Sequence, residues 1–179
     1  MEGANDEDAL RRAARAGDAV VLRELLARPG IDVNAPGEDA RTAVHLAADR
    51  GHGSVVALLA GRSDLDPNVE DTLGRTPLSL AAFGGQAEAV ERLLAHPRTD
   101  PNLVDRDGQT PLHWAALGGR DGVVHLLLAD PRTNTAIAND SGQTAAELAR
   151  AAGQNAVAAA IEARARQAAA QRSAQVSDF

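Results

Sequence analysis

The 179-residue sequence contains no cysteine, tyrosine or lysine, and only one tryptophan and two phenylalanines. Without cysteine it can form neither a disulfide framework nor a thiolate metal site. Because aromatic side chains are scarce, the hydrophobic 44% of the chain is mainly alanine, leucine and valine. A core of such small side chains favours closely packed helices. The length is that of one ordinary domain.

Positive charge is also scarce, because the chain has a formal charge of −7 at pH 7 and all 18 of its basic residues are arginine. Binding to a phosphate backbone requires a dense cluster of cations, so we do not expect nucleic acid as a partner. No apolar run has the length of a membrane-spanning helix, and the acidic start MEGANDEDA is unlike a secretory leader. We therefore expect a soluble intracellular protein, cytoplasmic or nuclear, with no membrane association.

What the sequence does contain is an internal repeat of 34 residues. TPLH at 110–113 recurs as TPLS at 76–79, as TAVH at 42–45 and as TAAE at 144–147. A divergent first copy fits residues 8–11, so the chain holds five repeats, and a fixed period of this length predicts a solenoid. Two further series keep the same spacing: Gly17, Gly51, Gly85, Gly119 and Gly153, and Asn34, Asn68 and Asn102.

Within one repeat the local signals predict a helix, a turn, a second helix and an extended loop. Thr110 can cap a free backbone amide, and Pro111 is suited to the first helical position. The glycine pair at 118–119 supplies the left-handed conformation that ends a short helix. Apolar residues within 123–128 follow at helical spacing, and the segment 97–109, rich in Asp, Asn, Pro and Gly, predicts a hairpin-like projection.

These features resemble the ankyrin repeat, in which TPLH, two alanines, a glycine, a second helix rich in Val and Leu, and a loop with Asp and Asn follow one another. The resemblance implies an all-α ankyrin-repeat solenoid of about five helix-turn-helix repeats with hairpin-like loops. Each repeat here has one residue more than the family's usual period, in the loop after the second helix. Repeat one lacks the TPLH pattern, and Arg150 replaces the second alanine in repeat five. The expected domains are an ankyrin repeat domain at 1–163, with repeats at about 5–36, 37–70, 71–104, 105–138 and 139–163, and a C-terminal helical extension and loose tail at 164–179.

The repeats have to stabilise one another by stacking, because a single helix pair cannot bury both of its faces. The alanine pairs at 47–48, 81–82 and 115–116 let neighbouring first helices approach closely. We expect Ala82→Leu to destabilise the stack by overpacking.

The C-terminal segment 155–171 has high helix propensity and no breaker. Glu162 and Arg166 are spaced to pair across one helical turn. The residues after Gln171 are expected to be loose. At the end of the sequence, Ser177 and Phe179 resemble a ligand for a carboxylate-capturing domain.

In the ankyrin family, partners bind to the hairpin tips and to the exposed face of the first helix, which together form a concave groove. The resemblance therefore implies a non-catalytic protein-protein interaction module. Leu73, Phe83, Trp114 and Leu117 offer apolar and aromatic anchors near arginines, a composition typical of protein interfaces. The predicted partner-binding residues are Arg41, Asp49, Arg50, Leu73, Arg75, Phe83, Arg106, Gln109, Trp114 and Leu117.

Two of these assignments have structural alternatives. Trp114 follows the TPLH histidine and can equally pack between helices, as large aromatic residues often serve core and interface at once. Arg41 and Arg75 can pair with a partner's carboxylates. Alternatively, nearby aspartates of the same surface can neutralise them: Asp39, Asp49 and Asp107.

Three other functions are weighed against protein binding. An enzyme or small-ligand binder needs a deep pocket of converging polar groups around Phe83 and Trp114. Self-association through the C-terminal helix needs a stable dimer, and a monomer is favoured. His45 and Asp49 have a spacing that can hold a metal, but no third ligand is indicated. We predict no catalytic residue, no metal and no cofactor.

Overall fold

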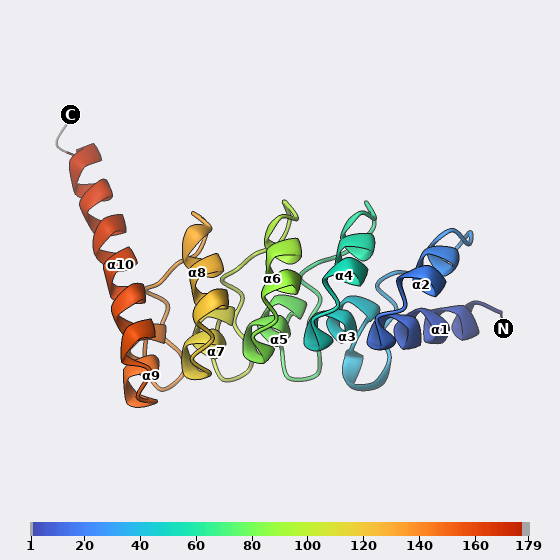
Figure 1. The fold of residues 1–179 in the computed structure, drawn as a ribbon, viewed down its shortest axis with the longest axis horizontal. Coiled ribbons are helices and arrows are strands. Elements are labelled where there is room, and N and C mark those ends of the chain that lie inside the picture. Colours follow the sequence, from blue (N-terminus) through green and yellow to red (C-terminus); the bar gives the residue numbers. More distant parts are fainter. Residues whose placement is uncertain (1, 177–179) are drawn as a thin grey trace.

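The computed structural model describes residues 2–176, and within them the chain forms five consecutive pairs of α-helices. Figure 1 shows the pairs standing side by side in a row, with the two ends of the chain at opposite ends of the stack. This arrangement confirms the predicted all-α solenoid. The first helices of the pairs are α1 (Glu2–Ala16), α3 (Ala43–Arg50), α5 (Pro77–Gly84), α7 (Pro111–Leu117) and α9 (Ala145–Ala151). The second helices are α2 (Ala19–Leu26), α4 (Gly53–Ala60), α6 (Ala87–Leu94), α8 (Asp121–Ala129) and α10 (Asn155–Val176).

Each first helix packs against the first helix of the next repeat, and each second helix does the same in a second layer. The core runs through the whole stack as one continuous cluster of small and medium apolar side chains. The predicted close approach of the first helices is confirmed, because their alanine pairs are completely buried: Ala47, Ala48, Ala81, Ala82, Ala115 and Ala116.

The starts and ends of the first helices follow the local signals in the sequence. The hydroxyl oxygen of Thr110 accepts a hydrogen bond from the backbone N–H of His113, and proline occupies the first turn of α7. Gly51 ends α3 in the left-handed conformation, with a φ of 73°. A Cβ there would also meet the end of the Gln86 side chain in the next repeat, which would have to move. Glycine at this position is therefore favoured by the turn.

His45 and His113 connect their repeats to the hairpin that follows. Nδ1 of His45 lies 3.2 Å from the backbone nitrogen of Thr42, and its Nε2 lies 3.1 Å from the carbonyl oxygen of Arg75. A carbonyl can only accept, so Nε2 carries the proton and Nδ1 accepts from Thr42, which requires a neutral ring. Burial lowers the pKa of His45 from 6.5 to about 4. His113 repeats this arrangement with the carbonyl oxygen of Gln143, at 3.0 Å.

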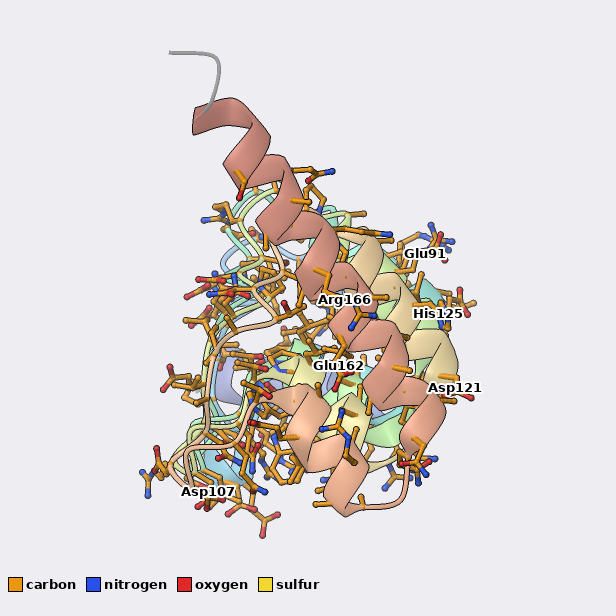
Figure 2. All side chains as sticks on the ribbon, turned by 90° about the vertical axis from the view of Figure 1, so that its left-hand side faces the viewer. Glu91, Asp107, Asp121, His125, Glu162 and Arg166 are labelled. Carbon is orange, nitrogen blue, oxygen red and sulfur yellow. The ribbon has the colours of Figure 1, made fainter. Side chains whose placement is uncertain are left out.

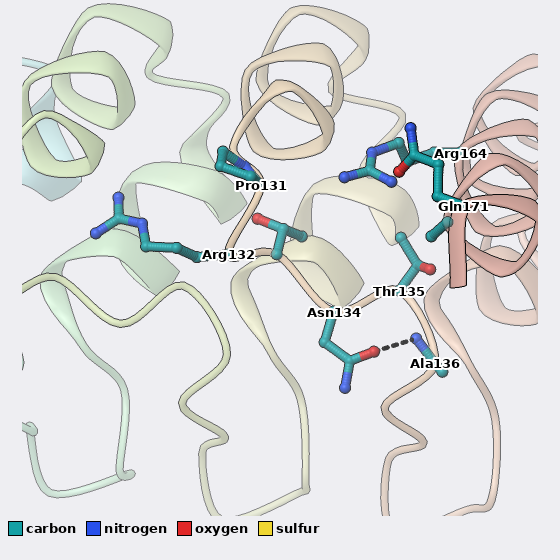
Figure 3. A pocket seen from close by; sticks show the side chains of 9 residues that line it. Pro131, Arg132, Asn134, Thr135, Ala136, Arg164 and Gln171 are labelled. Atoms are coloured by element: carbon teal, nitrogen blue, oxygen red, sulfur yellow. Dashed lines mark hydrogen bonds between the residues drawn. The ribbon is translucent and has the colours of Figure 1, made fainter. Parts of the chain in front are cut away.

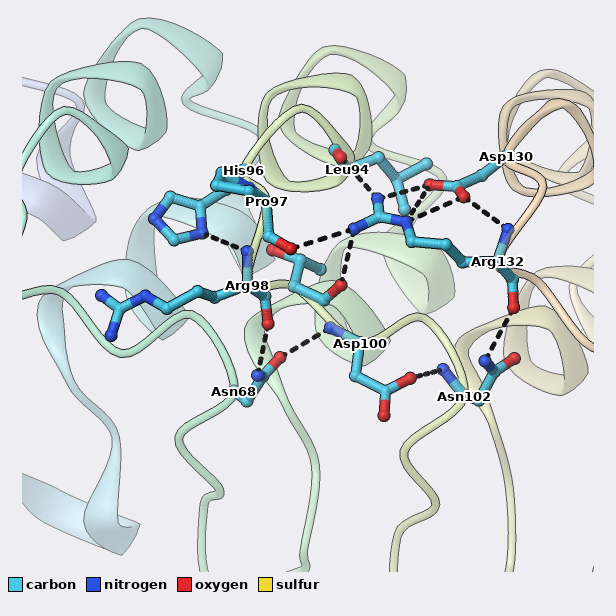
Figure 4. Close-up of polar contacts among 10 residues, drawn as sticks. Asn68, Leu94, His96, Pro97, Arg98, Asp100, Asn102, Asp130 and Arg132 are labelled. Atoms are coloured by element: carbon cyan, nitrogen blue, oxygen red, sulfur yellow. Dashed lines mark hydrogen bonds and ion pairs between the residues drawn. The ribbon is translucent and has the colours of Figure 1, made fainter.

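The asparagine series forms a ladder between the loops that follow the second helices (Figure 4). The side-chain amide of Asn68 donates to the carbonyl oxygen of Arg98 at 2.7 Å, and its side-chain oxygen accepts from the backbone N–H of Asp100 at 2.9 Å. Asn34 and Asn102 make the same pair of bonds to their following loops. The 34-residue spacing of asparagine is thus the spacing of one loop from the next.

Arginines in the same loops tie each repeat to the previous one. Arg132 donates to the carbonyl oxygens of Leu94, at the end of α6, and of Thr99, at 2.7 and 3.0 Å (Figure 4). These carbonyls include the negative end of a helix, so a guanidinium there is favourable. Two arginines of the equivalent loops do the same, Arg62 to Leu26 and Arg98 to Ser63 and Leu65, and Arg164 of helix α10 donates to Leu128. The loop in which the sequence has its extra residue therefore carries an inter-repeat clamp.

Helix α10 is longer than the other second helices and extends beyond the stack (Figure 1). It runs to Val176, so the expectation of a loose chain is wrong for residues 172–176, where no proline or glycine interrupts the helix. The predicted pair is present, with 3.9 Å between Oε2 of Glu162 and Nη1 of Arg166 (Figure 2). Glu162 also pairs with Arg150. The proposed terminal motif at Ser177 and Phe179 lies outside the described residues, and the repeat bounds stay predictions.

Candidate functional site

The predicted binding residues lie on the hairpins and on the exposed sides of the first helices, a surface that we call the inner face. Figure 2 shows Asp107 at a hairpin tip, on the side of the molecule opposite Asp121 and His125 of α8. Hairpins and first helices share this side because each hairpin leads directly into a first helix. The inner face therefore receives one hairpin and one helical surface from every central repeat.

An aromatic pair lies at the centre of the inner face. The rings of Phe83 and Trp114 contact edge to face, with centroids 5.3 Å apart and planes at 84°. Phe83, at the end of α5, is 51% exposed, whereas Trp114 on α7 is half-buried. The two alternatives for Trp114 are therefore both realised in part, because the indole packs against the stack and also reaches the surface. Such edge-to-face pairs favour a fixed relative position of the rings.

Asp105 fixes the Trp114 ring to the hairpin of its own repeat. The indole Nε1–H donates to Oδ2 of Asp105 at 2.7 Å. The other carboxylate oxygen accepts from the backbone N–H groups of Asp107 and Gln109, at 3.0 and 2.9 Å. One buried carboxylate thus determines both the turn of the hairpin and the position of the ring. Sequence reasoning missed Asp105, although Asp71 occurs 34 residues before it.

Asp71 holds the two hairpin arginines that were predicted to meet a partner. Its Oδ2 lies 2.7 Å from Nη2 of Arg75 and 3.5 Å from Nε of Arg41, and its side chain is fully buried. Burial alone would raise the pKa of Asp71, but hydrogen bonds from Arg75 and from the backbone outweigh it and leave this pKa below its usual value. Arg41 also pairs with Asp49 at 3.7 Å.

These pairs change the interpretation of the charged residues on the inner face. Of the three aspartates expected to neutralise Arg41 and Arg75, only Asp49 does so, and the main partner is Asp71, which the sequence analysis did not name. Because Asp71 lies in the hairpin just before Arg75, the signal that could have found it is the acidic residue four positions upstream of the arginine. Hydrogen bonds thereby hold the Arg75 guanidinium, whereas the Arg41 guanidinium makes the longer ion pairs only.

The aromatic pair borders a small hollow of about 80 Å3, which we call the aromatic hollow; its lining is Arg75, Ser79, Leu80, Phe83 and Trp114. Sites for small molecules usually enclose about 300 to 1,000 Å3. The polar groups of the lining are already engaged, since Arg75 binds Asp71 and the Ser79 hydroxyl lies 3.2 Å from that of Thr76. The hollow suits one apolar side chain and lacks the deep set of polar groups that the enzyme alternative requires.

The other predicted residues are distributed along the inner face. Gln109 accepts a hydrogen bond from the side-chain amide of Asn139 at 3.4 Å. Leu73 and Leu117 are 50% and 38% exposed. Arg50 and Arg106 are exposed and make no ion pair with any residue in the part of the chain that the structure describes. The structure thus brings Arg75, Phe83 and Trp114 together and pairs Arg41 with Asp49.

A second hollow, which we call the arginine hollow, lies between repeats one and two. It measures about 190 Å3 and is lined by Asp8, Arg11, Arg12, Arg15, Gly37, Glu38 and Leu46. Sequence reasoning missed these arginines because repeat one lacks the TPLH pattern. The signal was present in the period, since Arg12 and Arg15 occupy the positions that Leu80 and Phe83 hold two repeats later.

A larger open cavity of about 480 Å3 lies between the loop 131–136 and α10 (Figure 3). It is located where the asparagine ladder stops, because Ala136 stands at the position of Asn34, Asn68 and Asn102. Arg164 of α10 borders it and donates through Nε to the carbonyl oxygen of Leu128 at 3.1 Å. The cavity thus lies beside the last of these loops, where α10 continues as a helix.

The chemistry considered at His45 meets a structural obstacle. Both ring nitrogens of His45 are used within the protein, and Asp49 is paired with Arg41. Among the described residues, no group of three or more His, Cys, Asp or Glu side chains is placed to hold a metal ion. No helix in the described range 2–176 is both long enough and apolar enough to cross a membrane.

Comparison with known proteins agrees with this architecture. A family model described as "Ankyrin repeats (3 copies)" matches the chain over residues 10–105, 63–136 and 78–170. These matches overlap and together extend over most of the sequence. No curated protein matches the chain.

Proposed function

We propose that this chain, which belongs to the ankyrin repeat family, is a non-catalytic module that binds another protein through its inner face. Ankyrin repeats are in general protein-protein interaction modules. The proposed contact residues are Arg41, Asp49, Arg50, Leu73, Arg75, Phe83, Arg106, Gln109, Trp114 and Leu117. The proposed partner is a polypeptide, with no cofactor required.

The observation that carries the proposal is the aromatic pair with its hollow. Phe83 leaves half of its surface exposed although the fold does not need an aromatic residue there, since Asp49 and Leu117 take the same position in the neighbouring repeats. The Trp114 ring is held by Asp105, so little side-chain freedom is lost when a partner covers it. Rigid aromatic anchors of this kind provide much of the binding free energy in protein interfaces.

The paired arginines support the same proposal. Arg75 lines the aromatic hollow while its charge is balanced by Asp71, so a partner can cover it without leaving an unpaired buried charge. The guanidinium then presents its flat face and its aliphatic stem to the partner. The hollow therefore favours an apolar side chain over a charged one.

The test is a capture experiment with matched variants. The double variant Phe83→Ser and Leu117→Ser removes two exposed apolar side chains from the inner face, whereas Val20→Ser and Val21→Ser removes two exposed ones from α2. Proteins captured from the source cell extract are identified by mass spectrometry, and their affinity for each purified variant is then measured. We expect the first variant to lose affinity at least tenfold and the control to retain it. Equal affinity of both variants, with unchanged circular dichroism, would contradict the proposal.

A further inference from the structure

The two hollows of the inner face occupy the same place in the repeat. Adding two periods of 34 residues converts Arg11, Arg12, Arg15 and Leu46 of the arginine hollow into Ser79, Leu80, Phe83 and Trp114 of the aromatic hollow. The fold therefore builds one depression twice, with different side chains. A partner that crosses the stack along the inner face meets both.

The corresponding place between these hollows is closed by an ion pair. Arg41 and Asp49 occupy positions equivalent to Arg75 and Phe83 of the next repeat. Nη1 of Arg41 lies 3.7 Å from Oδ2 of Asp49. Leu46 and Leu80 are buried on either side of this position. The surface between the two hollows thus offers a balanced charge pair.

Arg12 and Arg15 make no hydrogen bond or ion pair through their guanidinium groups with any side chain that the structure describes. Arg11 differs, because it pairs with Asp8 and donates to the carbonyl oxygen of Ala35. The remaining carboxylate of the lining is Glu38. Two unpaired guanidinium groups therefore face one carboxylate, which gives this hollow an excess of positive charge in a chain whose formal charge is −7.

Gly37 lines the arginine hollow and brings no charge to it. It stands at the hairpin position that Asp71 and Asp105 hold in repeats three and four. The hairpin lies close to the Arg11 side chain here, since a Cβ at Gly37 would lie 2.7 Å from Cδ of Arg11. In repeat three, Asp71 balances Arg41 and Arg75 from the hairpin, whereas Gly37 offers no carboxylate at the equivalent position.

We propose that the partner contributes an extended segment with an acidic side chain in the arginine hollow and a branched aliphatic side chain in the aromatic hollow. This inference rests on the proposed function and adds the chemistry of the partner. Arginine recognises a carboxylate through paired hydrogen bonds. The aromatic hollow, at about 80 Å3, is small and is lined mainly by Leu80, Phe83 and Trp114, which favours a compact apolar side chain such as Val, Leu or Ile.

The spacing between the two side chains follows from the stack. Neighbouring packed helices lie about 8–10 Å apart, so two steps from α1 to α5 are about 16–20 Å. An extended chain advances about 3.3 Å per residue. The acidic and the aliphatic residue are therefore about five or six positions apart in the partner segment.

A phage-displayed library of random linear peptides tests this inference with the full chain as bait. We expect selected peptides to share an acidic and an aliphatic residue at this spacing. Binding of synthetic versions is then measured by fluorescence, because the chain has one tryptophan and no tyrosine, and the emission reports on Trp114 in the aromatic hollow. Phe83→Ser is expected to weaken binding at least tenfold.

Charge reversal is the decisive step. Arg12→Glu with Arg15→Glu changes the arginine hollow, whereas Arg23→Glu with Arg92→Glu makes the same charge change at exposed arginines of α2 and α6. We expect the first variant to bind the acidic peptides at least tenfold more weakly and to select peptides with a basic residue at the same spacing. The control is expected to behave as the parent.

The alternative outcomes separate this inference from the proposed function. Peptides that enrich an aliphatic residue with no acidic preference, or an unchanged preference in the Arg12→Glu and Arg15→Glu variant, overturn the inference and leave the inner face as a binding site. Failure to enrich any peptide, with the fold intact by circular dichroism, also overturns it. The capture experiment with Phe83→Ser and Leu117→Ser then decides independently whether the inner face binds a protein.

Discussion

Acidification is expected to weaken the stack through His45, which is fully buried between Thr42 and the Arg75 carbonyl. Its pKa is about 4 in the folded protein, against 6.5 for the free side chain. Between these values the unfolded chain binds a proton that the folded protein does not. Stability is therefore full above pH 6.5, falls as the pH drops toward 4, and loses no more from this group below that.

The size of the effect follows from the shift. One pKa unit corresponds to about 1.4 kcal/mol, so we expect His45 to lower the free energy of unfolding by about 2 kcal/mol at pH 5 relative to neutral pH. The cause is physical: protonation of Nδ1 removes the acceptor for Thr42 and places a charge in the core. The measurement runs from pH 7 to pH 5, above the usual aspartate pKa of 3.8, so that titration of aspartates does not dominate the change.

The assay compares the parent with His45→Ser by urea unfolding at several pH values, followed by circular dichroism. Serine is the natural choice because Ser79 takes this position in repeat three. His113 and His96, whose pKa values are also lowered by burial, are present in both proteins and cancel in the difference. We expect the stability advantage of the parent to shrink by about 2 kcal/mol between pH 7 and pH 5. A difference that stays constant would refute the reasoning.

Three further predictions follow from the stack. Ala82→Leu is expected to lower the free energy of unfolding by about 1–3 kcal/mol, because Ala82 is fully buried between first helices; a thermal melt equal to the parent's would argue against close packing here. Arg132→Met is expected to lower the free energy of unfolding by about 1–2 kcal/mol, because the hydrogen bonds to the carbonyls of Leu94 and Thr99 are lost. Arg92→Met is the exposed control, and equal unfolding midpoints for the two variants would argue against the clamp. Sedimentation is expected to show a monomer, since α10 beyond Ile161 carries only alanine and polar residues up to Val176; a stable dimer would favour self-association.

Much of the fold was predictable because the same local sequence signals occur in several repeats. Thr110 and Pro111 start a helix, and glycine ends it in the left-handed conformation at Gly51 and its equivalents, wherever the pattern occurs. The alanine pairs identified the buried side of the first helices. The end of α10 was harder to place, because composition alone does not define where a helix without a breaker stops.

The site was only partly predictable, because the sequence indicates which face is exposed and not which charges are already balanced. Phe83 and Trp114 were identified from positions that the repeat leaves free, and the structure places them in contact. Asp105 was missed because its partner Trp114 lies on the following helix, and Asp71 was missed although Arg75 follows it by four residues, because its second partner Arg41 belongs to another repeat. An arginine at a hairpin position looks the same in sequence whether it is held or free.

The sequence by itself determined that this protein is a row of five helix pairs, because burial of one small-residue face recurs every 34 residues and only stacking satisfies it. The tertiary structure alone decided which long side chains reach across the repeats. Arg62 and Arg164 stand at one position of the 34-residue period, and Arg98 and Arg132 stand two positions later in it. All four nevertheless donate to carbonyl oxygens of the preceding repeat. A flexible guanidinium can reach one target from several registers, so its partner depends on the folded geometry and not on the period.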